Sequence, residues 1–545
     1  MKRLGALLVA IVLCGAAPKP PEPLRLEVLF TSDIHGHIGR EPATFLNPEF
    51  PPLLGGGGSV ATYVTRVRRD AAAAGRRVLL LDSGDLFQGT PLAARTRGAA
   101  IVEWMNRMGY DAATLGNHDF DLGRDNTERL ARQANFPVVA ANLFERATGA
   151  RPAWVTDRVM IEVEGVRIAL LGYITESTVQ MSFEKNIAGL EFRPVVEVMP
   201  DDVLRARTDG ADLVLVLLHQ GLPYRLDVET EYRRMVEREA RGELARPGMD
   251  AMELARAVEG VDAFFAGHTH QGYDRAWEDP RTHALVFEPY ANGSSLGHVT
   301  LVIDRVTRGL IGYETHFDRG ALLTLLEEDV WPEPEEAERI EQQVEEAEAG
   351  LDVVVGRTRV ALESGAADNG LMGFVMADAF REELGTDFAI QNTGGVRSGI
   401  PAGPITERDL MRVAPFGNAM LVARVPGGML RGLVEDRLGG RGAGIFISGG
   451  RVRYDLSRPE GARLVDFTVG GAPIDTLRTY SVALTDYLAE GNSGMTRLLA
   501  LPPESFLPAG FTDRQVLAQW LRRQETIEPR NDGRWARVAR GERVP

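Results

Sequence analysis

The stretch LEVLFTSDIHG, residues 26–36, decides how the rest of the sequence is interpreted. It begins with an apolar run of the length of a buried strand, and Asp33 and His35 follow directly. In α/β proteins, polar groups that follow a buried strand lie at the carboxyl edge of a parallel sheet, where ligands bind. Taken alone, Asp33 is more commonly a cap or turn residue. The interpretation therefore depends on whether other strands end in the same way.

Four further apolar runs in the first half of the chain also end in polar groups. The runs are residues 78–81, 112–115, 213–218 and 263–266. The polar side chains that follow them are Asp85, Asn117, His118, His219, His268 and His270. Each one alone is more commonly a structural residue, but five strand ends with the same oxygen and imidazole chemistry make that explanation poor. We therefore expect these side chains to converge in one crevice at the carboxyl ends of the strands.

Apolar runs and amphipathic stretches alternate along the chain, which is typical of an α/β protein. Residues 166–173 form a further expected strand, and residues 60–74 and 100–108 are expected helices. The glycine-rich stretch at residues 55–58 resembles a phosphate loop only weakly, so we interpret it as a turn.

The composition changes at Trp-Pro-Glu-Pro, residues 331–334, which precedes an acidic run at residues 335–350. This run has too few apolar residues for a core helix, so it predicts a solvated linker helix. A second α/β region follows from about residue 353. The chain length of 545 residues is consistent with this division, because domains average about 150 residues.

The charge balance narrows the class of partner. The chain has 61 basic and 77 acidic side chains, a formal net charge of −16. A nucleic-acid partner is not expected, because neutralising phosphates requires a basic face. A small anionic molecule is still compatible, since net charge does not describe a single cleft.

The N-terminus predicts export. Lys2 and Arg3 precede a short apolar run, residues 4–13, and small residues follow at 15–17, so residues 1–17 are interpreted as a signal peptide. The run is too short for an ordinary membrane span, and we expect no stable span elsewhere. The mature protein would be periplasmic or extracellular. Lipid attachment at Cys14, the single cysteine, is an alternative.

The residue types at the strand ends indicate divalent metal ions. Asp, Asn and His without Cys suit Mn, Zn, Co, Fe or Mg. Asp85 is the natural carboxylate to be shared by two ions. One ion would be held by Asp33, His35, Asp85 and His270, and the other by Asp85, Asn117, His219 and His268. Two such cations would lower the pKa of a bound water, whose in-line attack would cleave a phosphate ester.

These motifs resemble those of a known family. Asp-x-His-Gly (33–36), Gly-Asp (84–85), Gly-Asn-His-Asp (116–119) and Gly-His-Thr-His (267–270) are similar to the motifs of the calcineurin-like metallophosphoesterases. Gly-Asn-His-Asp-Phe-Asp (116–121) narrows the resemblance to the 5′-nucleotidase family. The resemblance implies an N-terminal layered α/β metallophosphoesterase sandwich at 24–325, a linker helix at 326–352 and a C-terminal α/β substrate-binding domain at 353–545.

The resemblance also implies roles for individual residues. In this family the histidine after the metal-binding Asn and an Asp three positions later form a catalytic pair, here His118 and Asp121. An imidazolium held by a carboxylate would stabilise the transferring phosphoryl group and protonate the leaving oxygen.

The C-terminal half contains segments similar to the family's substrate motifs. Asn392 and Arg397 lie in a segment that implies anion binding, and Asn418 lies beside an aromatic residue, Phe416. Phe416 and Tyr487 would stack on a planar base. One departure is Ser493, which stands where the family has an Asp that binds ribose hydroxyls. Spacing alone does not choose a further phosphate-binding arginine near residues 357–359.

The sequence therefore predicts an exported dimetal phosphohydrolase that cleaves phosphate esters of nucleotides. Alternatives with the same fold are hydrolases of nucleotide-sugars, cyclic nucleotides or thiosulfonates. An alternative of another class is a non-catalytic nucleotide-binding protein of the cell envelope, which the complete set of ligand residues argues against. The native metals and the oligomeric state stay open.

Overall fold

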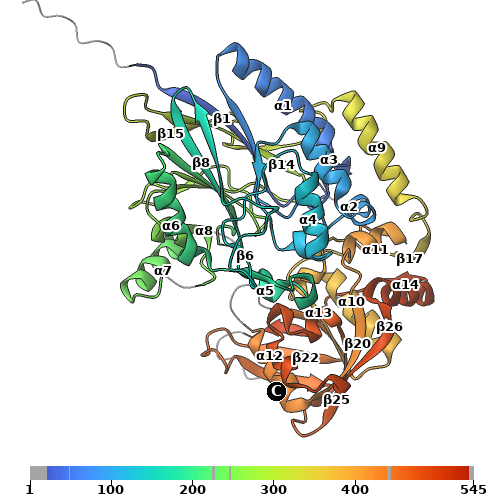
Figure 1. Cartoon of the computed structure of the whole chain (residues 1–545). Coiled ribbons are helices and arrows are strands. Elements are labelled where there is room, and N and C mark those ends of the chain that lie inside the picture. Colours follow the sequence, from blue (N-terminus) through green and yellow to red (C-terminus); the bar gives the residue numbers. More distant parts are fainter. Residues whose placement is uncertain (1–20, 48–49, 224–227, 245–246, 439–443, 539–545) are drawn as a thin grey trace, which may run out of the picture.

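The computed structural model describes residues 21–47, 50–223, 228–244, 247–438 and 444–538 (Figure 1). The predicted signal peptide and Cys14 lie outside these residues. In the described part of the chain, no helix combines the length and the apolar character that crossing a membrane requires.

Two six-stranded sheets form the first region, coloured blue to yellow-green in Figure 1. The first sheet contains, in spatial order, β15 (Leu310–Thr315), β14 (Ser295–Ile303), β1 (Leu24–Thr31), β4 (Val78–Asp82) and β5 (Ala112–Ala113), with β16 (Leu322–Thr324) paired to β14. The second contains β12 (Trp277–Glu278), β13 (Leu285–Phe287), β11 (Ala263–Ala266), β10 (Leu213–His219), β8 (Val166–Ile174) and β7 (Arg158–Val163). The pairs β1–β4, β8–β10, β10–β11 and β11–β13 are parallel.

The two sheets pack face to face, and helices cover their outer faces. Side chains alternate along β1, so Val28 and Phe30 pack between the sheets while Leu29 packs under helices. The ring of Phe30 lies 5.1 Å from that of Phe265 on the opposite sheet. The helices over the first sheet include α1 (Gly56–Ala73), α2 (Pro91–Thr96), α3 (Ala99–Met108) and α4 (Arg124–Gln133). Those over the second are α6 (Val195–Thr208), α7 (Val228–Ala240) and α8 (Ala251–Ala257).

The predicted layered α/β sandwich is confirmed, and so are the expected strands and helices of this region. The apolar runs were sufficient to locate the strands because both faces of each central strand are buried. The expected strand at 112–115 is shorter than its apolar run, since β5 contains two residues.

The interpretation of residues 55–58 as a turn is wrong. Gly56 to Gly58 form the first turn of α1. Gly56 has φ +55, and a Cβ there would lie 2.3 Å from the carbonyl oxygen of Gly39. A Cβ on Gly57 would lie 2.5 Å from the indole nitrogen of Trp104. The glycines therefore let neighbouring segments approach the start of the helix closely.

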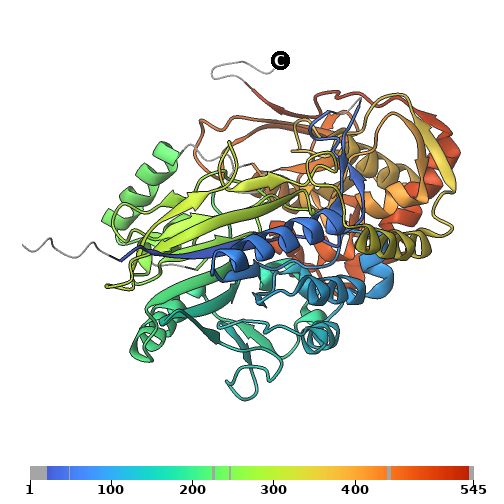
Figure 2. The same cartoon turned by 90° about the horizontal axis from the view of Figure 1, so that it is seen from above.

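The acidic run forms a helix, α9 (Pro334–Glu348), but the expectation that it is simply solvated is wrong. It packs against α1 and α2, as the views in Figures 1 and 2 both show. Ile340 is buried against the first region, and Glu336 is buried because Arg107 binds its carboxylate at 2.6 Å. A buried carboxylate paired with Arg107 and a few apolar contacts thus help to dock a helix whose outer face is acidic.

The C-terminal region, orange to red in Figure 1, has a hydrophobic core of its own. Its central sheet contains β21 (Ile445–Ser448), β18 (Phe388–Asn392), β25 (Thr479–Thr485), β20 (Ala419–Pro426) and β26 (Phe506–Thr512). Its helices are α10 (Leu371–Leu384), α11 (Glu407–Val413), α12 (Gly427–Asp436), α13 (Asp486–Ala489) and α14 (Asp513–Gln524). Smaller sheets join β17 (Val354–Thr358), β19 (Gly403–Thr406) and β27 (Thr526–Ile527), and β22 (Gly450–Tyr454), β23 (Leu464–Val469), β24 (Ala472–Pro473) and β28 (Trp535–Arg537).

A buried carboxylate stabilises the first sheet. Glu27 on β1 accepts hydrogen bonds from His298 at 3.2 Å, from Thr300 at 2.5 Å and from Arg76 at 2.9 Å. Burial favours a higher pKa for Glu27, but these donors together with His316 outweigh it and hold the pKa well below its usual range. The charged form of Glu27 therefore contributes to the stability of the fold.

We expect Glu27→Gln to lower the free energy of unfolding by about 1.5–3 kcal/mol at neutral pH, because charged hydrogen bonds in a buried site are lost. A depressed pKa stabilises the fold above the unfolded value of about 4.3, so the difference should shrink as the pH falls below that value. Urea unfolding at several pH values measures it. Glu314→Gln is the control, because its exposed ion pair with Arg25 should contribute less than about 1 kcal/mol. Equal losses in both variants would contradict the assignment.

Candidate functional site

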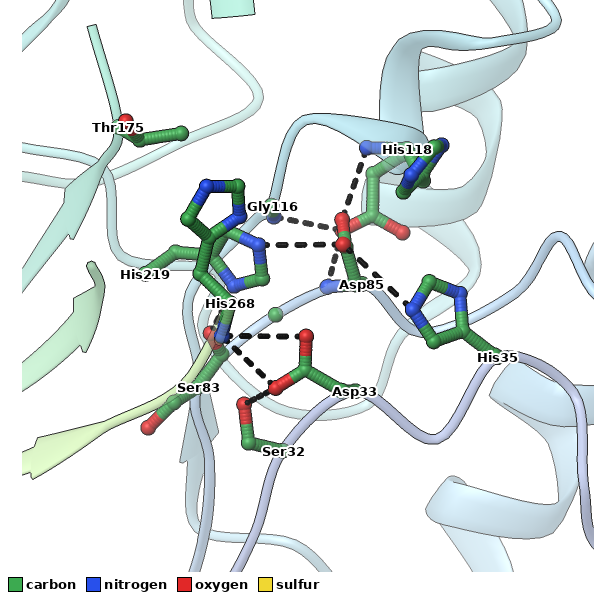
Figure 3. A network of polar contacts seen from close by, with 12 residues as sticks. Ser32, Asp33, His35, Ser83, Asp85, Gly116, His118, Thr175, His219 and His268 are labelled. Carbon is green, nitrogen blue, oxygen red and sulfur yellow. Dashed lines mark hydrogen bonds and ion pairs between the residues drawn. The ribbon is translucent and has the colours of Figure 1, made fainter. Parts of the chain in front are cut away.

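The polar side chains that follow the strands meet at one edge of the sandwich. Figure 3 shows this convergence around Asp85. The structure brings together Asp33, His35, Asp85, Asn117, His118, Asp121, His219, His268 and His270, all of them buried or half-buried. The sheets account for this, because β1 and β4 are parallel neighbours, as are β10 and β11.

One group of candidate metal ligands contains Asp33, His35 and His270, whose ligand atoms all lie within 4.8 Å of one another. The Nε2 atoms of His35 and His270 are 3.1 Å apart, and Asp33 Oδ1 is 3.4 Å from His270 Nε2. The Nδ1 atom of His35 faces the carbonyl oxygen of Gln88 at 3.0 Å. Donation of Nδ1–H to this carbonyl leaves the Nε2 lone pair directed into the group.

A second group contains Asp85, His219 and His268, again with ligand atoms within 4.8 Å of one another. His219 Nε2 lies 3.1 Å from Asp85 Oδ2, and its Nδ1 faces the carbonyl oxygen of Ser83 at 2.7 Å. The same Oδ2 atom of Asp85 is 3.7 Å from His35 Nε2 in the first group. Asp85 therefore lies between the two groups.

The donor atoms of the site fit divalent cations, and several of the residues that carry them have unfavourable backbone conformations. The oxygen and imidazole ligands match such ions, and Asn117 Oδ1 is buried with no hydrogen-bond partner among the described residues. Left-handed backbone conformations occur at Asp33 (φ 52), His35 (φ 49), Asp85 (φ 57), His268 (φ 77) and His270 (φ 59). Such conformations cost roughly 1–3 kcal/mol each for residues with a side chain and persist where surrounding structure holds them.

The charged forms of Asp85 and Asp33 are favoured within the site. Burial favours a higher pKa for Asp85, but His219, His118 and His35 outweigh it and hold the pKa well below its usual range. The pKa of Asp33 is also lowered, because His270 and His219 outweigh its burial. Anionic oxygens are thus available to bind cations.

Asp119, the last residue of the motif Gly-Asn-His-Asp (116–119), joins two loops of the site, a role that the motif alone does not reveal. Its Oδ2 accepts hydrogen bonds from the backbone N–H groups of Asp85 at 3.0 Å and Gly116 at 2.8 Å, and its Oδ1 accepts one from Leu86 at 3.0 Å. Burial and the neighbouring Asp85 raise the pKa of Asp119 to about 7. The loops after β4 and β5 are therefore held in one arrangement.

His118 and Asp121 form a close pair. His118 Nδ1 lies 2.7 Å from Asp121 Oδ2, and the backbone N–H of His118 donates to Asp85 Oδ1 at 2.8 Å. Burial favours a lower pKa for His118, but Asp121 and Asp85 outweigh it, so the pKa is raised. The carbonyl oxygen of Asp121 accepts a hydrogen bond from Asn186 at 2.7 Å, a contact that the sequence did not indicate.

Two residues of the C-terminal region reach this site. Arg397 Nη2 lies 3.2 Å from His35 Nε2. The ring of Phe416 stacks on that of His118, with centroids 5.3 Å apart and planes at 17°. A guanidinium and an aromatic ring from one region therefore contact histidines of the other.

The other expected substrate residues lie on neighbouring segments of the C-terminal region. Tyr487 packs edge-on against Phe183 of the first region, with ring centroids 5.9 Å apart. Asn392 donates a hydrogen bond to Ser493 Oγ at 3.2 Å. The carbonyl oxygen of Asn418, two residues after Phe416, accepts a hydrogen bond from the backbone N–H at the start of α14 at 2.9 Å.

A third group of potential ligands is structural. The ligand atoms of Glu27, His298 and His316 also lie within 4.8 Å of one another. However, the two imidazole rings are stacked 3.7 Å apart with planes at 5°. Lone pairs in parallel, stacked planes do not converge on one ion, and Glu27 is already paired with Arg76.

Comparisons with known proteins agree with this architecture. A model of the calcineurin-like phosphoesterases matches residues 26–272, and a model of the 5′-nucleotidase C-terminal domain matches residues 351–500. Endonuclease YhcR of Bacillus subtilis is 26% identical over 86% of this chain, which spans 37% of the length of that protein. Protein UshA of Yersinia enterocolitica is 24% identical, and the match covers 92% of each chain.

Solved structures show the same fold. A 5′-nucleotidase precursor from Thermus thermophilus superposes with a TM-score of 0.82 at 24% identity, covering 94% of this chain and 99% of that one. The sulfate thiohydrolase SoxB of Thermus thermophilus has a TM-score of 0.76 at 20% identity, with 97% and 99% covered. The first region is thus a calcineurin-like phosphoesterase domain. With its second domain, the chain belongs to the 5′-nucleotidase family.

We expect Asp85→Asn to abolish both metal retention and phosphate release, because a neutral amide is a poor ligand to share between two cations. The metal content after dialysis and the hydrolysis rate measure these effects. Glu314→Gln, on the far strand β15, is a control that should keep both. Two retained ions with a near-normal rate in Asp85→Asn would contradict the position of Asp85 between the groups.

Proposed function

We propose that this protein is an exported, metal-dependent phosphohydrolase that cleaves phosphate esters of 5′-nucleotides. The observation that carries the proposal is the meeting of two ligand groups with a guanidinium and an aromatic ring from the second domain. A phosphate ester with a planar base needs these elements together: cations and a cationic side chain for the phosphate, and a ring for the base.

The two ligand groups are proposed to hold two divalent ions that share Asp85. One ion is assigned to Asp33, His35, Asp85 and His270, and the other to Asp85, Asn117, His219 and His268. Asp85 Oδ2 lies 3.1 Å from His219 and 3.7 Å from His35, which supports a shared ligand. When bound, such ions lower the pKa of water and neutralise phosphoryl oxygens. Mn, Zn, Co, Fe and Mg all suit the donor set.

His118 is proposed to be the acid that protonates the leaving oxygen. Its Nδ1–H is directed to Asp121, so the proton to be transferred is on Nε2. Asp121 stabilises the protonated ring, and Asn186 fixes the backbone of Asp121 at 2.7 Å. Although burial opposes it, Asp121 and Asp85 raise the pKa of His118, which favours the protonated ring.

The C-terminal domain, residues 353–545, is proposed to bind the substrate, and the N-terminal domain, residues 24–325, to hydrolyse it. Arg397 lies beside His35, where it would grip the phosphate, and Phe416 and Tyr487 offer rings for the base. Asn392 and Asn418 would add polar contacts. Ser493 is neutral, so we infer that its hydrogen bonds to ribose hydroxyls are weaker than those of a carboxylate.

Export is proposed from residues 1–17, whose charge, apolar run and small residues fit a signal peptide. The protein would act in the periplasm or outside the cell, with lipid attachment at Cys14 as the alternative to cleavage. The partner is a small anionic molecule in either case.

We expect chelator-treated protein supplied with Mn²⁺ or Co²⁺ to release phosphate from 5′-nucleotides. His118→Ala should lower kcat about 10²–10⁴-fold, the usual contribution of a positioned acid or base, while both ions stay bound. Phosphate release and metal content are measured on the same samples. Loss of metal together with activity would make His118 a ligand. Activity confined to nucleotide-sugars, cyclic nucleotides or thiosulfonates would replace the proposed substrate.

Phe416→Ala should raise KM for a 5′-nucleotide more than for p-nitrophenyl phosphate, because a stack between a base and an aromatic ring contributes about 1–3 kcal/mol in nucleic-acid-binding proteins. The ratio of kcat/KM for the two substrates measures the effect and cancels any general loss of folded protein. Phe506→Ala, on β26 of the same domain, is the control. Equal losses on both substrates in Phe416→Ala would remove Phe416 from the binding site.

A further inference from the structure

Glu288 is a fully buried carboxyl group that the proposed function does not use. It follows β13 directly and has 0% of its surface exposed. Because Phe287 of β13 pairs with Phe265 of β11, Glu288 lies at the same sheet edge as the motif Gly-His-Thr-His (267–270). Another strand that is followed by a carboxyl group therefore reaches the site, although no sequence motif marks it.

Glu288 binds the two loops that follow β10 and β11 in the second sheet. Its Oε1 accepts a hydrogen bond from Thr269 Oγ1 at 2.5 Å, and its Oε2 accepts one from the backbone N–H of Leu222 at 2.7 Å. Thr269 separates His268 from His270, and Leu222 lies in the loop after β10. Both carboxyl oxygens are engaged in this way, so Glu288 is not itself placed as a ligand.

The contact is close enough to define the loop geometry. A Cβ on Gly221 would lie 2.4 Å from Glu288 Oε1 and 2.5 Å from Thr269 Oγ1, so the loops touch here without an intervening side chain. His268 and His270, on either side of Thr269, both have left-handed backbones, a conformation that needs support from its surroundings. The hydroxyl of Thr269, the residue between them, is bound by Glu288.

We propose that Glu288 is a positioning residue that, through Thr269, orients His268 and His270 toward the divalent cations. The proposal rests on the proposed function, because it assumes that these histidines are ligands. Groups that orient ligands from outside the coordination sphere typically change metal affinity or activity 10–100-fold when they are removed.

Thr269 offers a matched pair of variants. Thr269→Val keeps the shape of the side chain but removes the hydroxyl, and Thr269→Ser keeps the hydroxyl. In a Co²⁺ titration of the chelator-treated full chain, we expect Thr269→Val to weaken binding about 10–100-fold and to change the visible absorption of bound Co²⁺. Thr269→Ser should stay within about threefold of the unmodified chain, because the donor to Glu288 is retained.

Substitutions of Glu288 itself provide a second, independent pair of variants. Glu288→Ala should weaken Co²⁺ binding to a similar extent. Glu288→Gln should restore most of it, since the amide oxygen accepts from Leu222 and the amide N–H donates to Thr269 Oγ1. Tyr173→Phe is the control for a general loss of packing, because it removes a buried hydroxyl that contacts Asp202, away from the ligand loops.

The outcomes separate this inference from the proposed function. Thr269→Val could bind Co²⁺ with the affinity and the absorption spectrum of the unmodified chain and differ only in a lower melting temperature. That result would show that the contact is purely structural and would overturn the inference. The same conclusion follows if Tyr173→Phe weakens Co²⁺ binding as much as Thr269→Val. An unmodified chain that binds no Co²⁺ would overturn the proposed function, and the inference with it.

Discussion

The burial of Asp33 and Asp85 where the carboxyl ends of two packed sheets meet is the constraint on which the rest of the structure depends. Each is at most 1% exposed. Buried carboxylates are stable only when positive charge and hydrogen bonds compensate for lost hydration. The surrounding histidines supply part of that compensation, and bound divalent cations would supply the rest. Burying the two carboxylates costs hydration free energy. The hydrogen bonds of Asp119 and the contacts of Glu288 keep the surrounding loops in place despite that cost.

The second domain contributes to the site without sharing its core. Its apolar residues form a separate cluster, so it folds around its own sheet. It contacts the phosphoesterase domain at the site through polar and aromatic side chains, Arg397 against His35 and Phe416 against His118. A few polar and aromatic contacts are compatible with a binding cleft between the domains. A substrate can displace them more easily than it could separate a large, packed apolar interface.

The strands β1, β4, β8, β10 and β11 could be predicted because each is a short apolar run buried on both faces. The candidate ligands could also be predicted, since each follows such a run directly. Two expectations failed for one reason. The glycines at 55–58 and the acidic helix α9 look polar or flexible in isolation, but each faces a specific neighbour, Gly39 for Gly56 and Arg107 for Glu336. Local composition does not reveal such partners.

The sequence by itself identified the candidate ligands and the sheet edge that they share, because strand periodicity and strand-end motifs are local properties. Only the tertiary structure decided how those residues are held. Arg397 reaches a histidine 362 positions away, and Glu288 links the loops after β10 and β11. Contacts between distant segments depend on how the sheets pack and on which loops meet, and neither is encoded in the spacing of any single motif.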